Sequence, residues 1–256
     1  MSLNRFTLFG TLLGAAIGLG SVTPVLAAEV ELPHQNWSFE GPFGTYDKAS
    51  AQRGFLVYQQ VCSNCHSMKQ AYYRNLAGIG LSDEQIKAIA AQVDVPTIGD
   101  DGQPTTRKGL PSDHFKAPYP NEKAARAAQG GALPPDQSVL IKAREGGPDY
   151  IYALLTGYSE PPAGVKMGEG MNYNKVMAGN QIAMAAPLSD GRVEYTDGTK
   201  PTLEQEARDV TTFLAYIANP EMEQRKRLGV RVMLFLAALT CVTYAVKRQI
   251  WSDVHH

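Results

Sequence analysis

The sequence predicts an all-α domain with long irregular connections, followed by a single transmembrane helix near the C-terminus. Three observations support this fold class. In several segments a capping residue is followed by apolar residues at helical spacing. The 24 glycines and 16 prolines crowd the stretches between these segments, as is typical of long loops. One run, residues 229–246, is apolar enough to cross a bilayer.

Residues 1–28 have the layout of a secretory signal peptide. Arg5 precedes an apolar run over residues 6–19, and the small residues of "TPVLAAE" follow. This layout predicts cleavage after Ala27 or Ala28 and export of the chain that follows. The alternative is an uncleaved membrane anchor, which the glycines within the apolar run disfavour.

The exported chain is expected to begin with two helices. Residues 48–61 are predicted to form the first, with Phe55 and Tyr58 on one face. Ser82 and Gln85 make a capping box that opens the second, which extends to residue 92. Shorter helices are expected at 121–129, 136–144 and 149–157, a small hairpin at 189–199, and turns or loops over 93–120 and most of 158–201.

A longer amphipathic helix is predicted after residue 202. Thr202 and Gln205 form another capping box. Pro220 ends or kinks this helix. Its apolar residues recur at helical spacing: Ala207, Val210, Phe213, Leu214 and Ile217.

The apolar run 229–246 is interrupted only by Arg231, and cations flank it at residues 225–227 and 247–248. At 1.5 Å per residue, a helix of this length spans about 27 Å, close to the hydrocarbon thickness of a bilayer. A buried core helix is the alternative, but such a helix rarely has cations clustered at both ends. A transmembrane helix is therefore predicted.

These features divide the chain into three parts: a signal peptide (1–28), an exported domain (29–220), and a stalk with the transmembrane helix and a short cytoplasmic tail (221–256). The flanking cations favour the opposite orientation slightly. Export by the signal peptide takes precedence, because long domains translocate largely regardless of charge. The formal net charge of −1 and the lack of a long block of like charges argue against nucleic-acid binding.

The stretch "VCSNCHSM" places Cys62 and Cys65 three apart, with His66 directly after them. A zinc site would need two further ligands, and the remaining Cys241 lies in the apolar run. A thiol–disulfide oxidoreductase would place the motif at a helix start after a strand, whereas here it ends a helix. Covalent haem needs two thiols and an adjacent imidazole, so this spacing favours haem c with His66 as an iron ligand.

An electron-carrying haem needs a sixth iron ligand, and methionine is a common one that raises the reduction potential. Residue chemistry alone does not choose among the candidates, because most methionines are core residues. The candidates are Met68, Met167, Met171, Met177, Met184 and Met222.

Two levels of family resemblance follow. Gly54, Tyr58 and Cys62 lie on one helical face, which resembles the N-terminal helix of class I c-type cytochromes. In that family a glycine lets this helix cross closely over the C-terminal helix, whose face here would be residues 213–217.

A closer resemblance, to the cytochrome c1 family of haem subunits in the cytochrome bc1 complex, is carried by three stretches. They are "GALPPDQSVLIKAREGGPDYIYALLTGYSEPP", "GNQIAMAAPL" and "DVTTFLAYIANPEMEQRKRLGVRVMLFLAALTCVTYAVKRQIW". This likeness covers essentially all of the exported domain and its anchor.

The resemblance implies a set of site residues. Met184 would be the distal iron ligand, Arg144 would pair with a haem propionate, and Pro135 and Tyr150 would line the haem pocket. The alternative for Arg144 is a solvated cation at a helix C-terminus. Some bacterial relatives have a disulfide in this domain; this chain has no cysteines left for one, so packing is expected to steady the distal loop.

The resemblance also implies a function. It predicts a class I cytochrome anchored in the bacterial inner membrane, with one covalent haem c on the periplasmic side. Such a subunit would accept electrons from the Rieske iron–sulfur protein and pass them to a soluble cytochrome c, beside cytochrome b and membrane lipid. It would be an electron-transfer subunit and not an enzyme on its own. The alternatives are a stand-alone anchored cytochrome donating to a terminal oxidase, and a thiol–disulfide or metal-binding protein.

Overall fold

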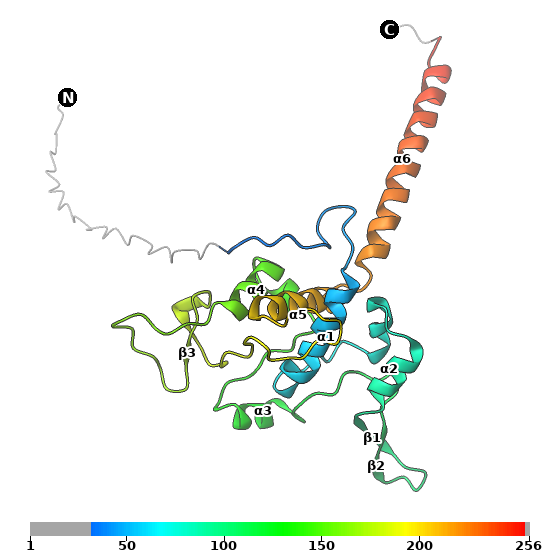
Figure 1. The fold of residues 1–256 in the computed structure, drawn as a ribbon. Coiled ribbons are helices and arrows are strands. Elements are labelled where there is room, and N and C mark those ends of the chain that lie inside the picture. The colour runs from blue at the N-terminus through cyan, green and yellow to red at the C-terminus, as the bar shows by residue number, and fades with distance from the viewer. Residues whose placement is uncertain (1–31, 254–256) are drawn as a thin grey trace, which may run out of the picture. The chain divides into compact units, whose positions relative to one another are not determined.

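The structure is a computed structural model that describes residues 32–253. The predicted signal peptide and its cleavage site lie outside the described residues, as do the last three residues of the predicted tail. Figure 1 shows the arrangement of the elements. The α-helices are α1 (Lys48–Gln60), α2 (Asp83–Ala90), α3 (Glu122–Ala128), α4 (Gly147–Thr156), α5 (Leu203–Ala218) and α6 (Met222–Ile250). The strands are β1 (Asp94–Ile98), β2 (Pro104–Lys108), β3 (Asn172–Tyr173) and β4 (Gln181–Ile182).

The core forms where α1 crosses α5 (Figure 1). Gly54 lies at the crossing, where a Cβ atom would collide with the carbonyl oxygen of Asp209 and lie 2.8 Å from Phe213 Cβ. The ring of Phe213, which is fully buried, packs against Phe55 and Tyr58 with centroids 5.5 and 5.7 Å apart. The expected close crossing at a glycine is confirmed.

Gly54→Ala is expected to lower the free energy of unfolding by about 1–3 kcal/mol, the usual cost of overpacking a core. The added methyl group has no space, because the neighbouring atom is a backbone carbonyl in α5. Urea unfolding of the detergent-solubilised chain measures the change. Gly229→Ala, where a Cβ meets nothing within 4 Å, is the matched control and should leave stability nearly unchanged. Equal stability of the two variants would contradict the tight crossing.

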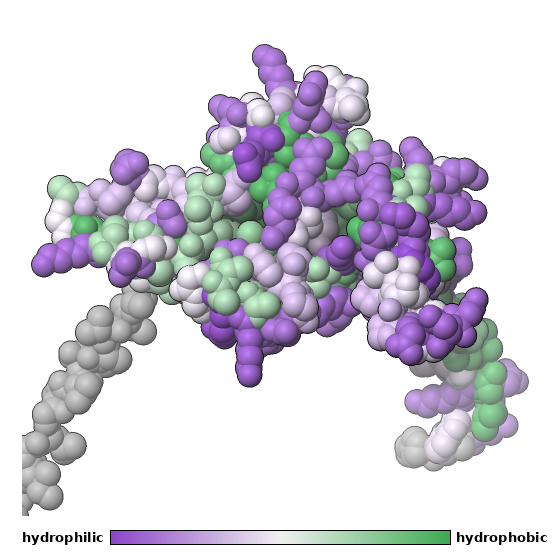
Figure 2. Space-filling model, turned by 90° about the horizontal axis from the view of Figure 1, so that it is seen from below, coloured by the Kyte–Doolittle hydropathy of each residue, from purple (hydrophilic) through white to green (hydrophobic). Residues whose placement is uncertain are grey.

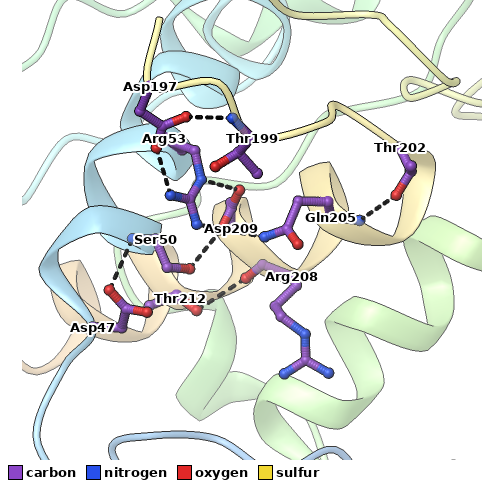
Figure 3. A network of polar contacts seen from close by, with 10 residues as sticks. All are labelled: Asp47, Ser50, Arg53, Asp197, Thr199, Thr202, Gln205, Arg208, Asp209 and Thr212. Carbon is purple, nitrogen blue, oxygen red and sulfur yellow. Dashed lines mark hydrogen bonds and ion pairs between the residues drawn. The ribbon is translucent and has the colours of Figure 1, made fainter. Parts of the chain in front are cut away.

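A buried polar network joins the same two helices to a loop (Figure 3). The Asp209 carboxylate is fully buried and accepts hydrogen bonds from Ser50 Oγ (2.6 Å), Gln205 Nε2 (3.0 Å) and the Arg53 guanidinium (2.8 and 3.0 Å). Arg53 also donates to Asp197 in the preceding loop at 2.8 Å. The hydrogen bond to Asp209 is the main reason that the pKa of Arg53 is raised, so the guanidinium stays charged.

The helix ends follow the predicted caps in part. Ser82 and Gln85 form the full capping box, whereas Thr202 receives only the Gln205 amide, because the Gln205 side chain is bonded to Asp209. The segment 136–144 contains only a 3₁₀ helix, Leu140–Ala143. Helix α4 begins at Gly147 and not at Asp149, whose carboxylate accepts instead from the Trp37 indole at 2.7 Å.

Two short antiparallel pairs qualify the all-α prediction. Strands β1 and β2 form a hairpin from Asp94–Lys108 to Ile98–Pro104, within residues expected to be turns. Prolines 96 and 104 argued against strands there, but a two-stranded hairpin has only edges, where proline is tolerated. The hairpin predicted at 189–199 has no strands. The side chains of its two aspartates bind groups outside the segment: Asp190 accepts a hydrogen bond from the Leu203 amide, and Asp197 pairs with Arg53.

Helix α6 begins at Met222, about two turns before the predicted apolar span. Within the part of the chain that the structure describes, it is the one helix long and apolar enough to cross a membrane. No residue of its apolar window is buried against the protein. By contrast, the face seen in Figure 2 is largely hydrophilic, with hydrophobic areas set between polar side chains. The continuous apolar surface of α6 therefore fits a single-pass membrane anchor.

Candidate functional site

The Cys-x-x-Cys-His motif forms one tight turn at the end of α1. The amides of Cys65 and His66 both donate to the Cys62 carbonyl, at 3.1 and 2.9 Å. Ser63 Oγ and Asn64 Nδ2 donate to the carbonyls of Gln59 and Gln60 at 2.7 and 2.8 Å, which satisfies the last carbonyls of the helix. The sequence therefore folds both cysteines and the histidine around a single turn.

His66 is held by a residue far along the chain. Its side chain is nearly buried, and Nδ1 lies 2.8 Å from the Pro135 carbonyl oxygen. A carbonyl only accepts, so Nδ1 carries the proton and the lone pair of Nε2 is free to bind a metal. Burial lowers the pKa of His66, which favours the neutral imidazole that iron ligation requires.

Asp136 fastens the motif to the segment that contains Pro135. Its carboxylate accepts hydrogen bonds from Ser67 Oγ (2.7 Å) and the amides of Lys69 (2.9 Å) and Ser138 (2.9 Å). Burial raises the pKa of Asp136, but these hydrogen bonds outweigh it and the net pKa is lowered. Ser67, which follows His66, is thus hydrogen-bonded to Asp136, which follows Pro135.

Asp136→Asn is expected to lower the melting temperature of the domain at neutral pH, and this difference should shrink as pH falls through the lowered pKa of Asp136. Because the folded pKa of Asp136 is lowered, its stabilisation is present above the unfolded pKa and is lost as pH falls through the folded pKa. The measurement is the difference in melting temperature between wild type and variant from neutral to acidic pH. Exposed Asp94→Asn is the control, and a pH-independent difference for Asp136 would contradict the expectation.

Cys62 and Cys65 are both free and not joined to each other. Burial raises the pKa of the Cys62 thiol to about 12, the opposite of the lowered value that a thiol–disulfide catalyst needs. Among residues 32–253, no group of three or more His, Cys, Asp or Glu side chains is placed to hold a metal ion. The raised pKa of Cys62 disfavours the oxidoreductase alternative.

Met184 follows strand β4 and is half-buried. Its carbonyl oxygen accepts a hydrogen bond from the Tyr158 hydroxyl at 3.1 Å. Burial raises the pKa of Tyr158, so this hydroxyl keeps its proton and remains a donor. Tyr158 lies just past the end of α4, and it ties the Met184 segment to that helix.

The loop before Met184 is organised by Asn174, which is fully buried. Asn174 Nδ2 donates to the Leu154 carbonyl in α4 at 2.8 Å, and Oδ1 accepts from the amides of Val176 (3.0 Å) and Met177 (3.2 Å). Its own amide donates to the Asn180 carbonyl at 3.1 Å. Packing was expected to steady this loop, and the structure adds hydrogen bonds from a buried amide and from the β3–β4 pair.

Asn174→Ala is expected to loosen the loop locally, because three backbone groups lose their buried partner at about 1–3 kcal/mol each. Amide hydrogen exchange at Val176 and Met177 should accelerate strongly, while exchange in α1 changes little. Asn172→Ala, a half-buried neighbour in β3, is the matched control. Unchanged protection in Asn174→Ala would show that the side chain does not organise the loop.

The remaining predicted residues lie in different surroundings. The Pro135 ring is exposed, next to the carbonyl that binds His66. Tyr150, in α4, places its hydroxyl 3.7 Å from Met177 Sδ. Arg144 is exposed and its guanidinium donates to the adjacent Ala143 carbonyl at 3.0 Å. Arg144 therefore resembles the solvated cation that was its alternative, with its head group free to bind an anion.

Burial also separates the methionine candidates. Met68 and Met222 are core residues, with exposed fractions of 0% and 6%. Met167, Met171, Met177 and Met184 are all half-buried and lie on the long segment after α4. Tyrosine hydroxyls reach two of these four: Tyr158, just past α4, donates to the Met184 carbonyl oxygen, and Tyr150, in α4, donates to Met177 Sδ.

These residues fit a haem. Two free cysteines, an imidazole with Nε2 directed by the Pro135 hydrogen bond, and a half-buried methionine segment are the groups that a covalent haem requires. Sequence reasoning missed Asp136, Tyr158 and Asn174. Their roles depend on contacts with distant backbone groups, which leave no spacing pattern in the sequence.

Comparisons with known proteins agree with this picture. The model of the Cytochrome C1 family matches residues 37–254. "Cytochrome c1" of Rhodospirillum rubrum is 43% identical over 260 residues, covering 95% of this chain and 96% of that protein. "Cytochrome c1, heme protein, mitochondrial" of Saccharomyces cerevisiae is 47% identical over 224 residues, covering 87% and 72%. "Cytochrome b-c1 complex catalytic subunit, mitochondrial" of Candida albicans is 46% identical over 224 residues, covering 87% and 78%.

Proposed function

Because this chain belongs to the cytochrome c1 family, we propose that its exported domain, residues 29–220, carries one covalently bound haem c and transfers single electrons. The observation that carries the proposal is the hydrogen bond from His66 Nδ1 to the Pro135 carbonyl, which frees Nε2 beside two unpaired cysteines. When bound, the haem supplies a one-electron iron couple.

The residues of the chain have separate roles in this proposal. Cys62 and Cys65 would hold the haem through thioether bonds, and His66 Nε2 and the Met184 thioether would bind its iron. Pro135 fixes the orientation of the imidazole, and Tyr158 holds the backbone of Met184. Arg144 pairs with a propionate through its free guanidinium, and Tyr150 lines the pocket. No proton transfer or nucleophile is needed, because the protein contributes ligands, low dielectric and a docking face.

The proposed partners follow from the family. One relative is named as a subunit of the cytochrome b-c1 complex. In this chain α6 anchors the domain in the bacterial inner membrane, with the haem on the periplasmic side. Electrons arrive from the Rieske iron–sulfur protein and leave to a soluble cytochrome c, with cytochrome b beside the anchor. The alternative is a stand-alone anchored cytochrome that donates to a terminal oxidase.

Affinity purification of the tagged full-length chain from its native membrane tests this proposal. The mass of the chain should exceed that of its amino acids by one haem, and a pyridine haemochrome spectrum should show thioether-linked haem. A di-haem cytochrome b and an iron–sulfur protein should co-purify. Haem-containing chain without these partners would favour the stand-alone cytochrome, and a chain without haem would contradict the proposal.

A further inference from the structure

Residues 38–45 form a compact loop before α1 with an exposed aromatic residue near its tip. The Thr45 amide donates to the Ser38 carbonyl at 3.0 Å and closes the loop. Gly41, with φ of +67°, makes the turn that precedes Phe43. Phe43 is 80% exposed, more than any other large hydrophobic side chain in residues 32–253. We refer to residues 38–45 as the Phe43 loop.

The Phe43 loop is fastened to the first turns of α6. Lys226 Nζ donates to the carbonyls of Phe39 (2.7 Å) and Gly44 (3.0 Å), one on each side of the tip. The Tyr46 amide, just past the loop, donates to Glu223 Oε1 at 2.9 Å. Figure 1 shows the loop rising beside the start of α6, on the side toward which that helix extends. The loop is thus held at a defined level along the helix axis.

The Phe43 loop lies beside the point where the apolar, membrane-spanning part of α6 begins. The apolar surface of α6 begins at Leu228, which is 56% exposed and lies only about 3 Å along the axis from Lys226 at 1.5 Å per residue. The loop therefore lies at the depth of the lipid headgroups when α6 crosses a bilayer. Glu40 is its one charged residue, and that carboxylate lies 3.8 Å from His34 Nε2.

We propose that the Phe43 loop is a second membrane contact, with Phe43 inserted among the lipid headgroups and upper acyl chains. Aromatic side chains are favoured at this depth, where an apolar ring leaves water without crossing the bilayer. A helix anchor alone permits the domain to tilt and rotate about its axis. A second contact, attached rigidly through Lys226, restricts that motion and holds the exported domain at one orientation to the membrane.

Lipid is a better candidate than a protein partner to cover the exposed Phe43 side chain. The exposed apolar surface of the loop is one phenylalanine flanked by Pro42 and Gly44, whereas a stable protein interface buries about 800 Å² on each partner. The position of the loop beside the apolar span also places it against lipid without any further assembly.

A nitroxide at position 43 tests this proposal in the full-length chain. Cys241→Ser removes the exposed cysteine of α6, and Phe43→Cys is then labelled and the protein reconstituted into vesicles of phosphatidylcholine and phosphatidylglycerol. Electron paramagnetic resonance power saturation compares collisions with oxygen, which concentrates in lipid, and with a water-soluble nickel chelate. Ile98→Cys (65% exposed, in the β1–β2 hairpin) and Val242→Cys (60% exposed, in α6) are the matched controls for water and lipid.

The ratio of oxygen to nickel collisions at position 43 should be several-fold above that at 98 and below that at 242. A ratio equal to that at 98 would overturn the proposal. So would a label protected from both reagents in the purified complex, because a protein would then cover the loop. The Cys241→Ser parent should take up no label, since Cys62 and Cys65 are bonded to haem; labelling of the parent would count against the haem proposal alone.

Discussion

Met184→Leu is expected to abolish the methionine–iron charge-transfer band and to lower the reduction potential sharply. A thioether ligand stabilises ferrous over ferric iron, and leucine has no atom that can replace it. Axial ligands set haem potentials over a range of roughly 0.8 V, so the shift should be a sizeable part of that range. The vacant sixth position should also bind carbon monoxide. Optical spectroscopy and a redox titration of the purified chain measure these changes.

Met177→Leu is the matched control for this prediction. Met177 lies on the same segment after α4, is similarly half-buried, and is near another aromatic hydroxyl, that of Tyr150. Its replacement should leave the band and the affinity for carbon monoxide unchanged. An unchanged band in Met184→Leu, with loss of the band in Met177→Leu, would transfer the ligand role to Met177 and contradict the proposed site.

Asp209→Ala is expected to destabilise the domain by about 3–5 kcal/mol, because it removes the buried partner of Arg53 and leaves that cation only the more exposed Asp197. Asp209 accepts four hydrogen bonds, two of them from Arg53, and its side chain is fully buried. The lost hydrogen bonds join α1 to α5 and involve none of the haem-binding residues. The midpoint of urea unfolding should therefore fall, while the haem content of the folded protein stays the same. Urea titration of the solubilised chain, followed by far-ultraviolet circular dichroism, measures the change.

Two further variants identify the cause. Asp94→Ala breaks the exposed pair with Lys108, at 3.0 Å, and should cost less than about 1 kcal/mol, as surface pairs do. The double variant Arg53→Met with Asp209→Leu removes both charges and should recover much of the lost stability. A double variant as unstable as Asp209→Ala would show that shape, and not the unpaired charge, causes the loss.

The sequence predicted the helical parts of the fold well, because their signals are local. The Ser82 capping box and the apolar surface of α6 arise from residues within a few positions of each other, whereas the crossing at Gly54 was expected from the resemblance to class I cytochromes. The β1–β2 hairpin was missed because prolines usually argue against a strand. Here both strands are edge strands, and edge strands tolerate proline. The segment 189–199 has turns at both Asp-Gly positions but no strands, and Asp190 and Asp197 bind the Leu203 amide and Arg53.

Spacing along the chain was enough to predict the chemistry to be tested: two thiols and an imidazole within a few residues, and a span of apolar residues at the length of a bilayer. Both depend on spacing along the chain. The groups that orient this chemistry are known from the fold, in which three contacts join distant residues. Pro135 binds His66, Tyr158 binds the Met184 segment, and Lys226 binds the Phe43 loop. Single hydrogen bonds between irregular segments have no periodicity, so folding alone brings these partners together.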